Sequence, residues 1–373
     1  MKWRIPVAEP CLGEEEKKAV TDVVESGRIS QGDRTREFEA TIAKYVGRKY
    51  GVACHSGTCA NEAMLMAVLQ PSADDMTGLF QGKYVAFPTC SSVAVSNPAL
   101  YCRAKPEFID LDRKLCMDIE QLEALPGAIG LVAAMHVHAY GSYPEHWDLA
   151  QQSKIPMLED TCVALGSEYE GRKLGSFGLA SSLSFYVNKL ITASEGGMVV
   201  TDDEQFAKYC WEYVNHGRTQ STMHESWYYN HIGRNAKMTD LQAAIGLAQF
   251  QKIQKFIDAR KKIGQTLYNS LKDDPRFSTF TPSAGEVPWT FWVVNWDGTV
   301  NMAKASDRLQ REFNIETRPT LPVLPKLPFY NYPGTWPVGE ASQNGFIVSC
   351  SPAILEHDDL DYLKESLVNC LTT

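Results

Sequence analysis

The chain has 373 residues, of which 44% are hydrophobic and 22% are charged, so its composition is that of a globular protein long enough for two domains. Its net charge of −9 argues against a general binder of nucleic acids or anionic membranes. The 10 cysteines form no C-x-x-C pair, and no stretch approaches the roughly 18 apolar residues of a membrane span, so we expect a cytoplasmic protein with reduced thiols.

Short apolar runs alternate with helical patterns through the first two thirds of the chain. Gly27 follows the first helical pattern directly and is a good stop signal. Short apolar runs separated by crossover helices are typical of buried parallel strands. The predicted fold class is therefore α/β, with a mainly parallel sheet flanked by helices. The predicted helices are 14–26, 37–45 and 118–124, and the predicted strands are 84–87, 107–109, 130–135 and 155–158.

The last third of the chain has a different order of elements. One long helix is expected to start at Thr239 and to run past Gln251 toward Leu267. Beyond it, strands are predicted at 290–296 and 345–349, and helices at 301–313 and 357–371. We therefore predict a large domain over residues 1–250 and a smaller α+β domain over residues 251–373.

Ser56, Gly57 and Thr58 precede a helical pattern that runs to Leu69. Backbone N–H groups at a helix start, with two hydroxyls nearby, suit a phosphate group. For the tripeptide alone, a simple capped helix is the more usual explanation.

Asp160 ends the apolar run that begins at Ile155. Ligands of open α/β sheets bind at the carboxyl ends of strands, where this carboxylate is expected to lie. It could keep a pyridine nitrogen protonated, so that a cofactor ring acts as an electron sink. The alternative is a helix N-cap, because Asp is a favoured cap.

Lys189 follows a predicted strand over residues 182–187 and precedes the turn at Gly196 and Gly197. A lysine held out of bulk water there has a lowered pKa and can attack a carbonyl group. The position points to a Schiff base. The alternative, a solvated loop lysine, is the usual state of Lys in proteins.

Taken in order, these segments resemble the DegT/DnrJ/StrS family of pyridoxal-phosphate (PLP) aminotransferases. The resemblance covers nearly the whole chain, and the order and spacing of its blocks make it specific. It implies PLP fold type I, with a sheet of the seven-stranded type. Besides the three segments above, it includes residues 27–32, 137–141, 171–178, 195–197, 215–217 and 233–244.

The resemblance also implies roles for individual residues. Lys189 would form the Schiff base and act as acid and base, and Asp160 would pair with the pyridinium nitrogen. Asn235 matches a position that reaches the phosphate from a partner subunit, which implies a homodimer with shared active sites. The expected phosphate contacts in the same subunit are Ser56, Gly57, Thr58 and Ser184.

Two expected cofactor contacts depart from the family pattern. Ser92 stands where relatives place an aromatic ring, and Val163 stands where they carry Gln or His. A stacked ring contributes about 0.5–1.5 kcal/mol beyond its buried area, and a neutral hydrogen bond about 1 kcal/mol. We expect each loss to weaken cofactor binding by up to about tenfold without removing the chemistry.

Five residues are candidates for substrate binding. His138 fits the family's active-site strand, although with His136 it could in principle ligate a metal. His216 could instead cap a loop, and Arg318 could instead form a surface ion pair. The five candidates are Ile29, His138, Tyr186, His216 and Arg318. No metal site is expected.

The predicted function is transfer of an amino group, with glutamate as the expected donor, to a keto-sugar that is expected to be linked to a nucleotide. A keto-cyclitol or other non-nucleotide ketone is the alternative acceptor. A non-catalytic regulatory or binding protein on the same fold is a further alternative. Lys189 disfavours a related dehydratase branch, which carries His at that position. No G-x-G-x-x-G follows the first strand, which disfavours a dinucleotide oxidoreductase.

Overall fold

The computed structural model describes residues 3–70, 82–125, 130–219, 228–229, 231–279 and 285–371. Its larger sheet has seven strands. From β3 to β8 in sheet order, each strand pairs in parallel with the strand beside it. β9 runs antiparallel to both of its neighbours. In sheet order, the strands are β1 (Tyr50–Cys54), β9 (Gly197–Thr201), β8 (Ala180–Ser184), β5 (Met157–Asp160), β4 (Leu131–Val137), β2 (Tyr84–Pro88) and β3 (Lys105–Ile109). The predicted α/β class with a mainly parallel seven-stranded sheet is confirmed.

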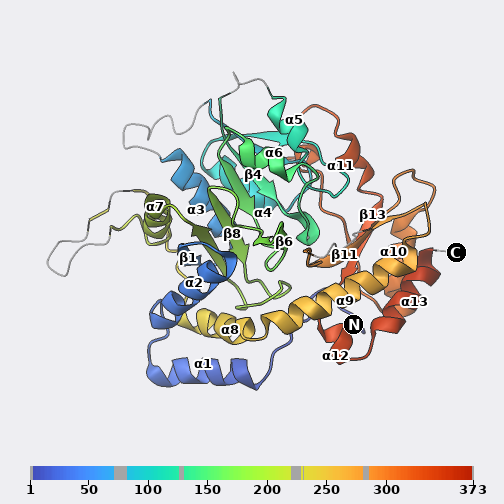
Figure 1. Ribbon diagram of the computed structural model, residues 1–373, viewed down its shortest axis with the longest axis horizontal. Helices are drawn as coiled ribbons and strands as arrows, with labels where there is room; N and C mark the ends of the chain where they lie inside the picture. The colour runs from blue at the N-terminus through green and yellow to red at the C-terminus, as the bar shows by residue number, and fades with distance from the viewer. Residues whose placement is uncertain are drawn as a thin grey trace.

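Helices cover both faces of this sheet (Figure 1). One core includes side chains from α3, α4, α7 and the strands they cover, and a second joins α2 and α8 to β1, β8 and β9. The helices of this region are α1 (Glu14–Ser26), α2 (Asp33–Val46), α3 (Gly57–Leu69), α4 (Val93–Tyr101), α5 (Ile119–Glu123), α6 (Trp147–Gln152), α7 (Glu204–Val214) and α8 (Asp240–Phe250). The short elements η2 (Ala139–Gly141), β6 (Glu168–Tyr169) and β7 (Arg172–Lys173) lie in the connections.

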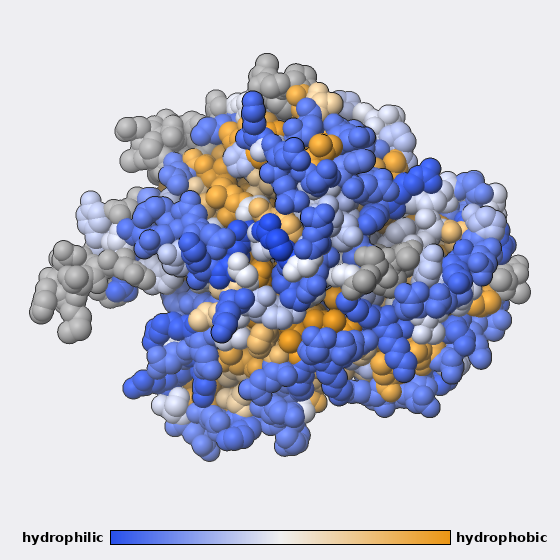
Figure 2. Space-filling model, viewed as in Figure 1, coloured by the Kyte–Doolittle hydropathy of each residue, from blue (hydrophilic) through white to orange (hydrophobic). Residues whose placement is uncertain are grey.

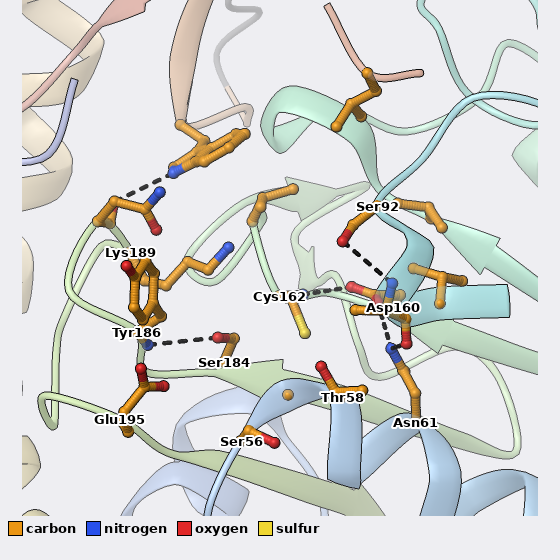
Figure 3. Close-up of a pocket in the computed structure, with 18 residues that line it drawn as sticks. Ser56, Thr58, Asn61, Ser92, Asp160, Cys162, Ser184, Tyr186, Lys189 and Glu195 are labelled. Carbon is orange, nitrogen blue, oxygen red and sulfur yellow. Dashed lines mark hydrogen bonds between the residues drawn. The ribbon is translucent and has the colours of Figure 1, made fainter. Parts of the chain in front are cut away.

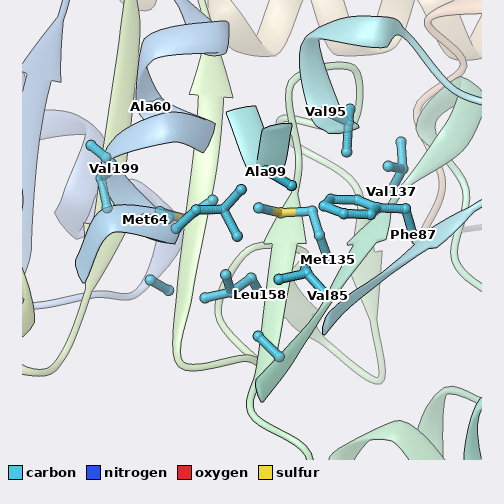
Figure 4. Close-up of a cluster of buried hydrophobic side chains, with 14 of the residues drawn as sticks. Ala60, Met64, Val85, Phe87, Val95, Ala99, Met135, Val137, Leu158 and Val199 are labelled. Carbon is cyan, nitrogen blue, oxygen red and sulfur yellow. The ribbon is translucent and has the colours of Figure 1, made fainter. Parts of the chain in front are cut away.

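Helix α3 is the central helix of the first core. It is apolar around most of its circumference and is buried along almost its whole length, as expected of a helix covered on all sides. Figure 4 shows its side chains against the strands of the sheet. The labelled members of this core are Ala60, Met64, Val85, Phe87, Val95, Ala99, Met135, Val137, Leu158 and Val199. This packing fixes the start of α3 at the carboxyl edge of the parallel strands.

Helix α2 begins four residues before the predicted start at residue 37. The side chain of Asp240, in α8, accepts hydrogen bonds from the backbone amides of Gly32 and Thr35 at 2.8 and 2.9 Å. These amides would otherwise lack helical partners. The helix is therefore extended by a contact between distant parts of the sequence.

A second, antiparallel sheet follows in the last third of the chain. Its strands, in sheet order, are β10 (Ser278–Thr279), β11 (Thr290–Val294), β13 (Gly345–Ser349) and β12 (Arg318–Pro319). Its core includes residues of α9 (Ile253–Leu271), α10 (Met302–Phe313) and α13 (Leu360–Leu371). The remaining helices are η3 (Leu324–Lys326), α11 (Pro337–Ala341) and α12 (Ala353–Glu356).

The single long helix predicted from Thr239 is two helices in the structure. A turn at Gln251 and Lys252 separates α8 from α9. The turn lets α8 pack against α1 and α2 while α9 packs on the second sheet. A domain boundary near residue 250 remains our proposal.

No helix in the described part of the chain is long and apolar enough to cross a membrane. Figure 2 shows hydrophilic residues over most of one face, with smaller hydrophobic areas between them.

Candidate active site

A cavity of about 440 Å³ opens at the carboxyl edge of the large sheet. Figure 3 shows Lys189 and Tyr186 on one side of it and Asp160 and Asn61 on the opposite side. The cavity brings together nine residues predicted from the sequence: Ser56, Gly57, Thr58, Ser92, Asp160, Val163, Ser184, Tyr186 and Lys189. These residues are spread over 134 positions of the sequence, so the fold alone makes them neighbours.

The start of α3 forms one wall of the cavity. Ser56 caps the helix, because its side chain accepts a hydrogen bond from the amide of Cys59 at 3.2 Å. Gly57 follows and lies close to the end of β8 and to the turn after β5. A Cβ added to it would lie 2.9 Å from both Ser184 Cβ and Cys162 Sγ. The first amides of the helix and the side chain of Thr58 therefore border the cavity. This arrangement suits an anion such as a phosphate.

Asp160 ends β5 and is only 3% exposed. Its Oδ2 accepts a hydrogen bond from Asn61 Nδ2 at 2.8 Å, and its Oδ1 accepts one from the amide of Cys162 at 3.0 Å. The residues that follow form a turn rather than a helix, so Asp160 is not a helix cap. A buried carboxylate with two donors and one side toward a cavity suits a cationic group of a ligand.

Lys189 lies in the turn five residues beyond the end of β8 and is half-buried. Burial lowers the pKa of its amine below the usual value, while the thiol of Cys162 and the carboxylate of Asp160 oppose the shift and Arg260 adds to it. The indole ring of Trp289 lies with its centroid 4.8 Å from the amine nitrogen. A lowered pKa increases the neutral fraction of the amine, which is the nucleophilic form.

Glu159 supports the same strand end from the opposite side. It is fully buried, and its carboxylate accepts hydrogen bonds from the amides of Gly175, Phe177 and Gly178 at 2.7–2.9 Å. Burial raises the pKa of this carboxyl group, but the hydrogen bond and charge of His138, the Gly178 amide and Arg48 outweigh it, so that the net pKa is lowered. Glu159 therefore fixes the backbone next to Asp160.

His138 contacts Glu159 and does not line the cavity. Its two ring nitrogens lie 2.9 Å from Glu159 Oε2 and 3.2 Å from the backbone oxygen of Ser142. Both neighbours are acceptors, so only the doubly protonated ring can donate to both. The neighbouring His136 is fully buried, and burial and His138 lower its pKa. Among the described residues, no group of three or more His, Cys, Asp or Glu side chains could hold a metal ion.

Four other candidates lie outside the cavity of their own chain. Ile29 is 50% exposed, and His216 is exposed in a turn. Arg318 pairs with Glu316 at 3.2 Å, which is the surface ion pair given above as the alternative to substrate binding. Asn235 is exposed, and its side-chain oxygen accepts a hydrogen bond from Lys237 at 2.8 Å. Roles for these residues in binding substrate or cofactor remain predictions.

Nine further residues line the cavity, and none of them was predicted as a site residue. Four of these are aliphatic, and the other five are Asn61, Cys162, Asn188, Glu195 and Trp289. Asn61 had a detectable signal, since it is one of few polar residues in the largely apolar α3, one turn after Gly57. Trp289 had none, because it precedes a strand of the other sheet and reaches the cavity only through the tertiary fold.

The cavity fits PLP. Its volume lies within the range of about 300–1,000 Å³ that is usual for small-molecule sites. The start of α3 suits the phosphate, and Asp160 suits a protonated ring nitrogen. Lys189 supplies an amine of lowered pKa for the carbonyl group.

The comparisons with known proteins agree with this chemistry. GDP-perosamine synthase of Escherichia coli O157:H7 is 30% identical over 342 residues, which cover 89% of this chain and 88% of that protein. GDP-perosamine synthase of Caulobacter vibrioides is 34% identical over 265 residues, covering 70% of this chain and 68% of that protein.

Solved structures also share the fold. The aminotransferase PseC of Helicobacter pylori matches with a TM-score of 0.87 at 24% identity and covers 100% of both chains. GDP-4-keto-6-deoxy-D-mannose-3-dehydratase of E. coli, with bound hydrated PLP, matches with a TM-score of 0.87 at 25% identity. That match covers 98% of this chain and 100% of the dehydratase.

A family model matches residues 10–350, which is most of the chain. The match agrees with the resemblance drawn from the sequence and with the PLP-bound dehydratase structure. The chain therefore belongs to the DegT/DnrJ/EryC1/StrS aminotransferase family and is a PLP-dependent aminotransferase.

Proposed function

We propose that this enzyme transfers an amino group from glutamate to a nucleotide-linked keto-sugar. The observation that carries the proposal is that Lys189, Asp160 and the start of α3 all line one cavity. Two relatives that act as GDP-perosamine synthases, at 30% and 34% identity, support a sugar nucleotide as the acceptor. A structural neighbour with a trapped PLP-glutamate adduct, at 27% identity, supports glutamate as the donor.

Several residues would hold the cofactor. Ser56, Gly57, Thr58 and Ser184 would bind the phosphate group through hydroxyls and helix amides. Asp160, held by Asn61, would keep a proton on the ring nitrogen. When bound, PLP supplies an electron sink that stabilises negative charge at the carbon next to the transferred nitrogen.

Lys189 would have two tasks. Its neutral amine would hold the cofactor covalently, and burial favours this neutral form. The same amine would take a proton from the donor Cα as a general base and return it as a general acid. The same residue separates this proposal from dehydration, since the related dehydratases carry His in its place.

Asn235 motivates a second part of the proposal, a homodimer with shared active sites. Its side chain is exposed and lies outside the cavity of its own chain. An exposed amide at this place is available to a phosphate in a partner subunit.

The test is isotope transfer. The PLP-loaded enzyme would be incubated with ¹⁵N-glutamate and a panel of nucleotide-linked keto-sugars and keto-cyclitols. The masses of the products would then be measured by mass spectrometry. We expect ¹⁵N in a nucleotide-linked amino sugar. The label in a cyclitol alone, or a sugar that loses oxygen without gaining nitrogen, would contradict the proposal.

Matched lysine variants sharpen this test. Lys189→Ala should abolish the transfer, and reduction with borohydride should attach the cofactor to Lys189 in the wild type. Lys255→Ala, which removes an exposed lysine paired with Glu356, should leave the transfer unchanged. An adduct on another lysine would overturn the assignment of Lys189.

A further inference from the structure

Arg260 is a buried cation on the apolar face of α9. It is 4% exposed and follows the helical spacing of Phe256, Ile257 and Ile263 on the buried side. No ion pair joins it to a carboxylate within the part of the chain that the structure describes. A buried charge without a counter-ion is costly, so its presence calls for an explanation.

Among the described residues, the guanidinium donates only to backbone carbonyl groups. Nη1 lies 2.5 Å from the oxygen of Trp289, and Nη2 lies 3.1 Å from that of Lys189 and 3.4 Å from that of Asn188. The indole nitrogen of Trp289 donates to the same oxygen of Asn188 at 3.2 Å. One side chain thus joins three segments: α9, the turn after β8, and the residues before β11.

These contacts hold the backbone of the turn from which the lysine side chain extends. The turn carries Lys189, and the Trp289 ring faces its amine at 4.8 Å. A planar group with several fixed donors can bridge carbonyls in this way, whereas a lysine at the same place has one nitrogen and no fixed fork.

We propose that Arg260 is a positioning residue for the reaction, which fixes the Lys189 turn and the Trp289 ring relative to each other so that the amine faces the cavity. The proposal rests on the role given to Lys189 above.

Electrostatics supports the same role. The charged and titratable groups that act on Lys189 are Asp160, Cys162 and Arg260, and of these only Arg260 lowers the pKa of the amine. Arg260 itself stays charged at neutral pH, because burial lowers its pKa only to about 10, while Cys350 and Cys11 raise it. A second positive charge nearby disfavours protonation of the lysine.

The test measures Lys189 directly, in the protein without cofactor. An amine-acylating reagent would be applied between pH 6 and 10, and modification of each lysine would be followed by mass spectrometry. Arg260→Met removes the charge and keeps most of the volume. We expect it to slow Lys189 modification at pH 7 by roughly three- to tenfold and to move the pH profile upward.

Two further variants separate charge from position. Arg260→Lys keeps the charge, so its profile should stay near that of the wild type, while the rate of ¹⁵N transfer falls because the three carbonyls are no longer bridged. Trp289→Phe keeps a ring but removes the donor to Asn188, and it tests the same contact if Arg260→Met does not fold.

Arg48→Met controls for the loss of a buried arginine that donates to carbonyl oxygens, those of Gly175 and Gly178. Unlike Arg260, Arg48 also pairs with Asp202 at 3.0 Å and with Glu159 at 3.7 Å, and none of these contacts is with the Lys189 turn. This variant should leave the Lys189 profile unchanged. Equal profiles for Arg260→Met, Trp289→Phe and the wild type, or equal shifts in Arg260→Met and Arg48→Met, would overturn the proposal. If the Lys189 profile shifts as expected but no acceptor gains ¹⁵N, the proposed function fails, while the effect of Arg260 on the Lys189 amine stands.

Discussion

Glu159→Gln tests how the fold fixes the strand end that carries Asp160. The substitution keeps the shape of the side chain and removes its charge. In the wild type, Oε1 accepts from the amides of Phe177 and Gly178, and Oε2 accepts from Gly175 and from His138. If Oε1 becomes the NH₂ group, it faces two amide donors. If Oε2 does, it faces the Gly175 amide and a His138 ring that must give up its proton in order to accept.

The magnitude follows from these contacts. The charge that strengthens all four hydrogen bonds is lost, and hydrogen bonds to a charged group contribute about 1.5–3 kcal/mol each. Breaking a buried ion pair by removing one partner costs about 3–5 kcal/mol. We therefore expect the free energy of unfolding to fall by roughly 3–5 kcal/mol.

Urea unfolding of the cofactor-free protein at pH 7.5 measures this loss. The control is Glu312→Gln, which removes one end of an exposed pair with Arg308 four residues earlier in α10 and should cost less than about 0.5 kcal/mol. A Glu159→Gln variant within about 0.5 kcal/mol of this control would refute the reasoning.

The pH dependence gives a second check. The folded state lowers the pKa of Glu159 below its ordinary value of 4.5. The stabilisation is therefore complete above that value and is lost as the pH falls through the folded pKa. The difference between wild type and Glu159→Gln should be constant from pH 8 to about 5.5 and should shrink on further acidification. A difference that grows in acid would contradict the assignment.

Three further predictions concern the cofactor and the proposed dimer. Asp160→Asn should lower the rate of amino transfer more than PLP occupancy, since an amide cannot stabilise a protonated ring nitrogen; near wild-type turnover would contradict this role. Ser92→Trp should tighten PLP binding by up to about 1 kcal/mol, measured by titration, although loss of the α4 cap should cost about 1 kcal/mol of stability; unchanged affinity would argue that no ring stacks there. Mixed Lys189→Ala and Asn235→Ala subunits should recover activity, because one of the two shared sites in the heterodimer is intact; verified heterodimers without activity would exclude a shared site.

Much of the large sheet could be predicted from the sequence because its central strands are continuous apolar runs. One example is the run 130–135, which overlaps β4 (Leu131–Val137). The position of Asp160 followed from the same pattern, since a buried run that ends in carboxylates marks the edge of a sheet. The antiparallel direction of β9 could not be predicted, because its residues are as apolar as those of the parallel strands. The break between α8 and α9 also has no proline or glycine at residues 251 and 252 to signal it.

Side chains that act through tertiary contacts were beyond the sequence. The sequence marks Asn61 only as a polar residue in a largely apolar helix, and its hydrogen bond to a residue 99 positions away is seen only in the structure. Arg260 looks like one more charge in a helix until its neighbours are known, although its place on the apolar face of α9 was a usable signal. Polar residues at core positions of otherwise amphipathic helices therefore merit separate inspection, since burial without a partner is too costly to be accidental.

The two departures from the family pattern acquire a physical meaning in the cavity. Ser92 already uses its hydroxyl to accept from the amide of Ala94 at 3.3 Å, and Val163 offers only an aliphatic surface. Neither residue provides a stacking ring, and of the two only Ser92 keeps a proton that it can donate. The polar groups that suit PLP are instead concentrated at Asp160, the start of α3 and Lys189. Cofactor affinity should therefore depend on these contacts more steeply than in relatives that also stack a ring. A gain in affinity from Ser92→Trp would measure the binding free energy that this chain lacks because no ring stacks at position 92.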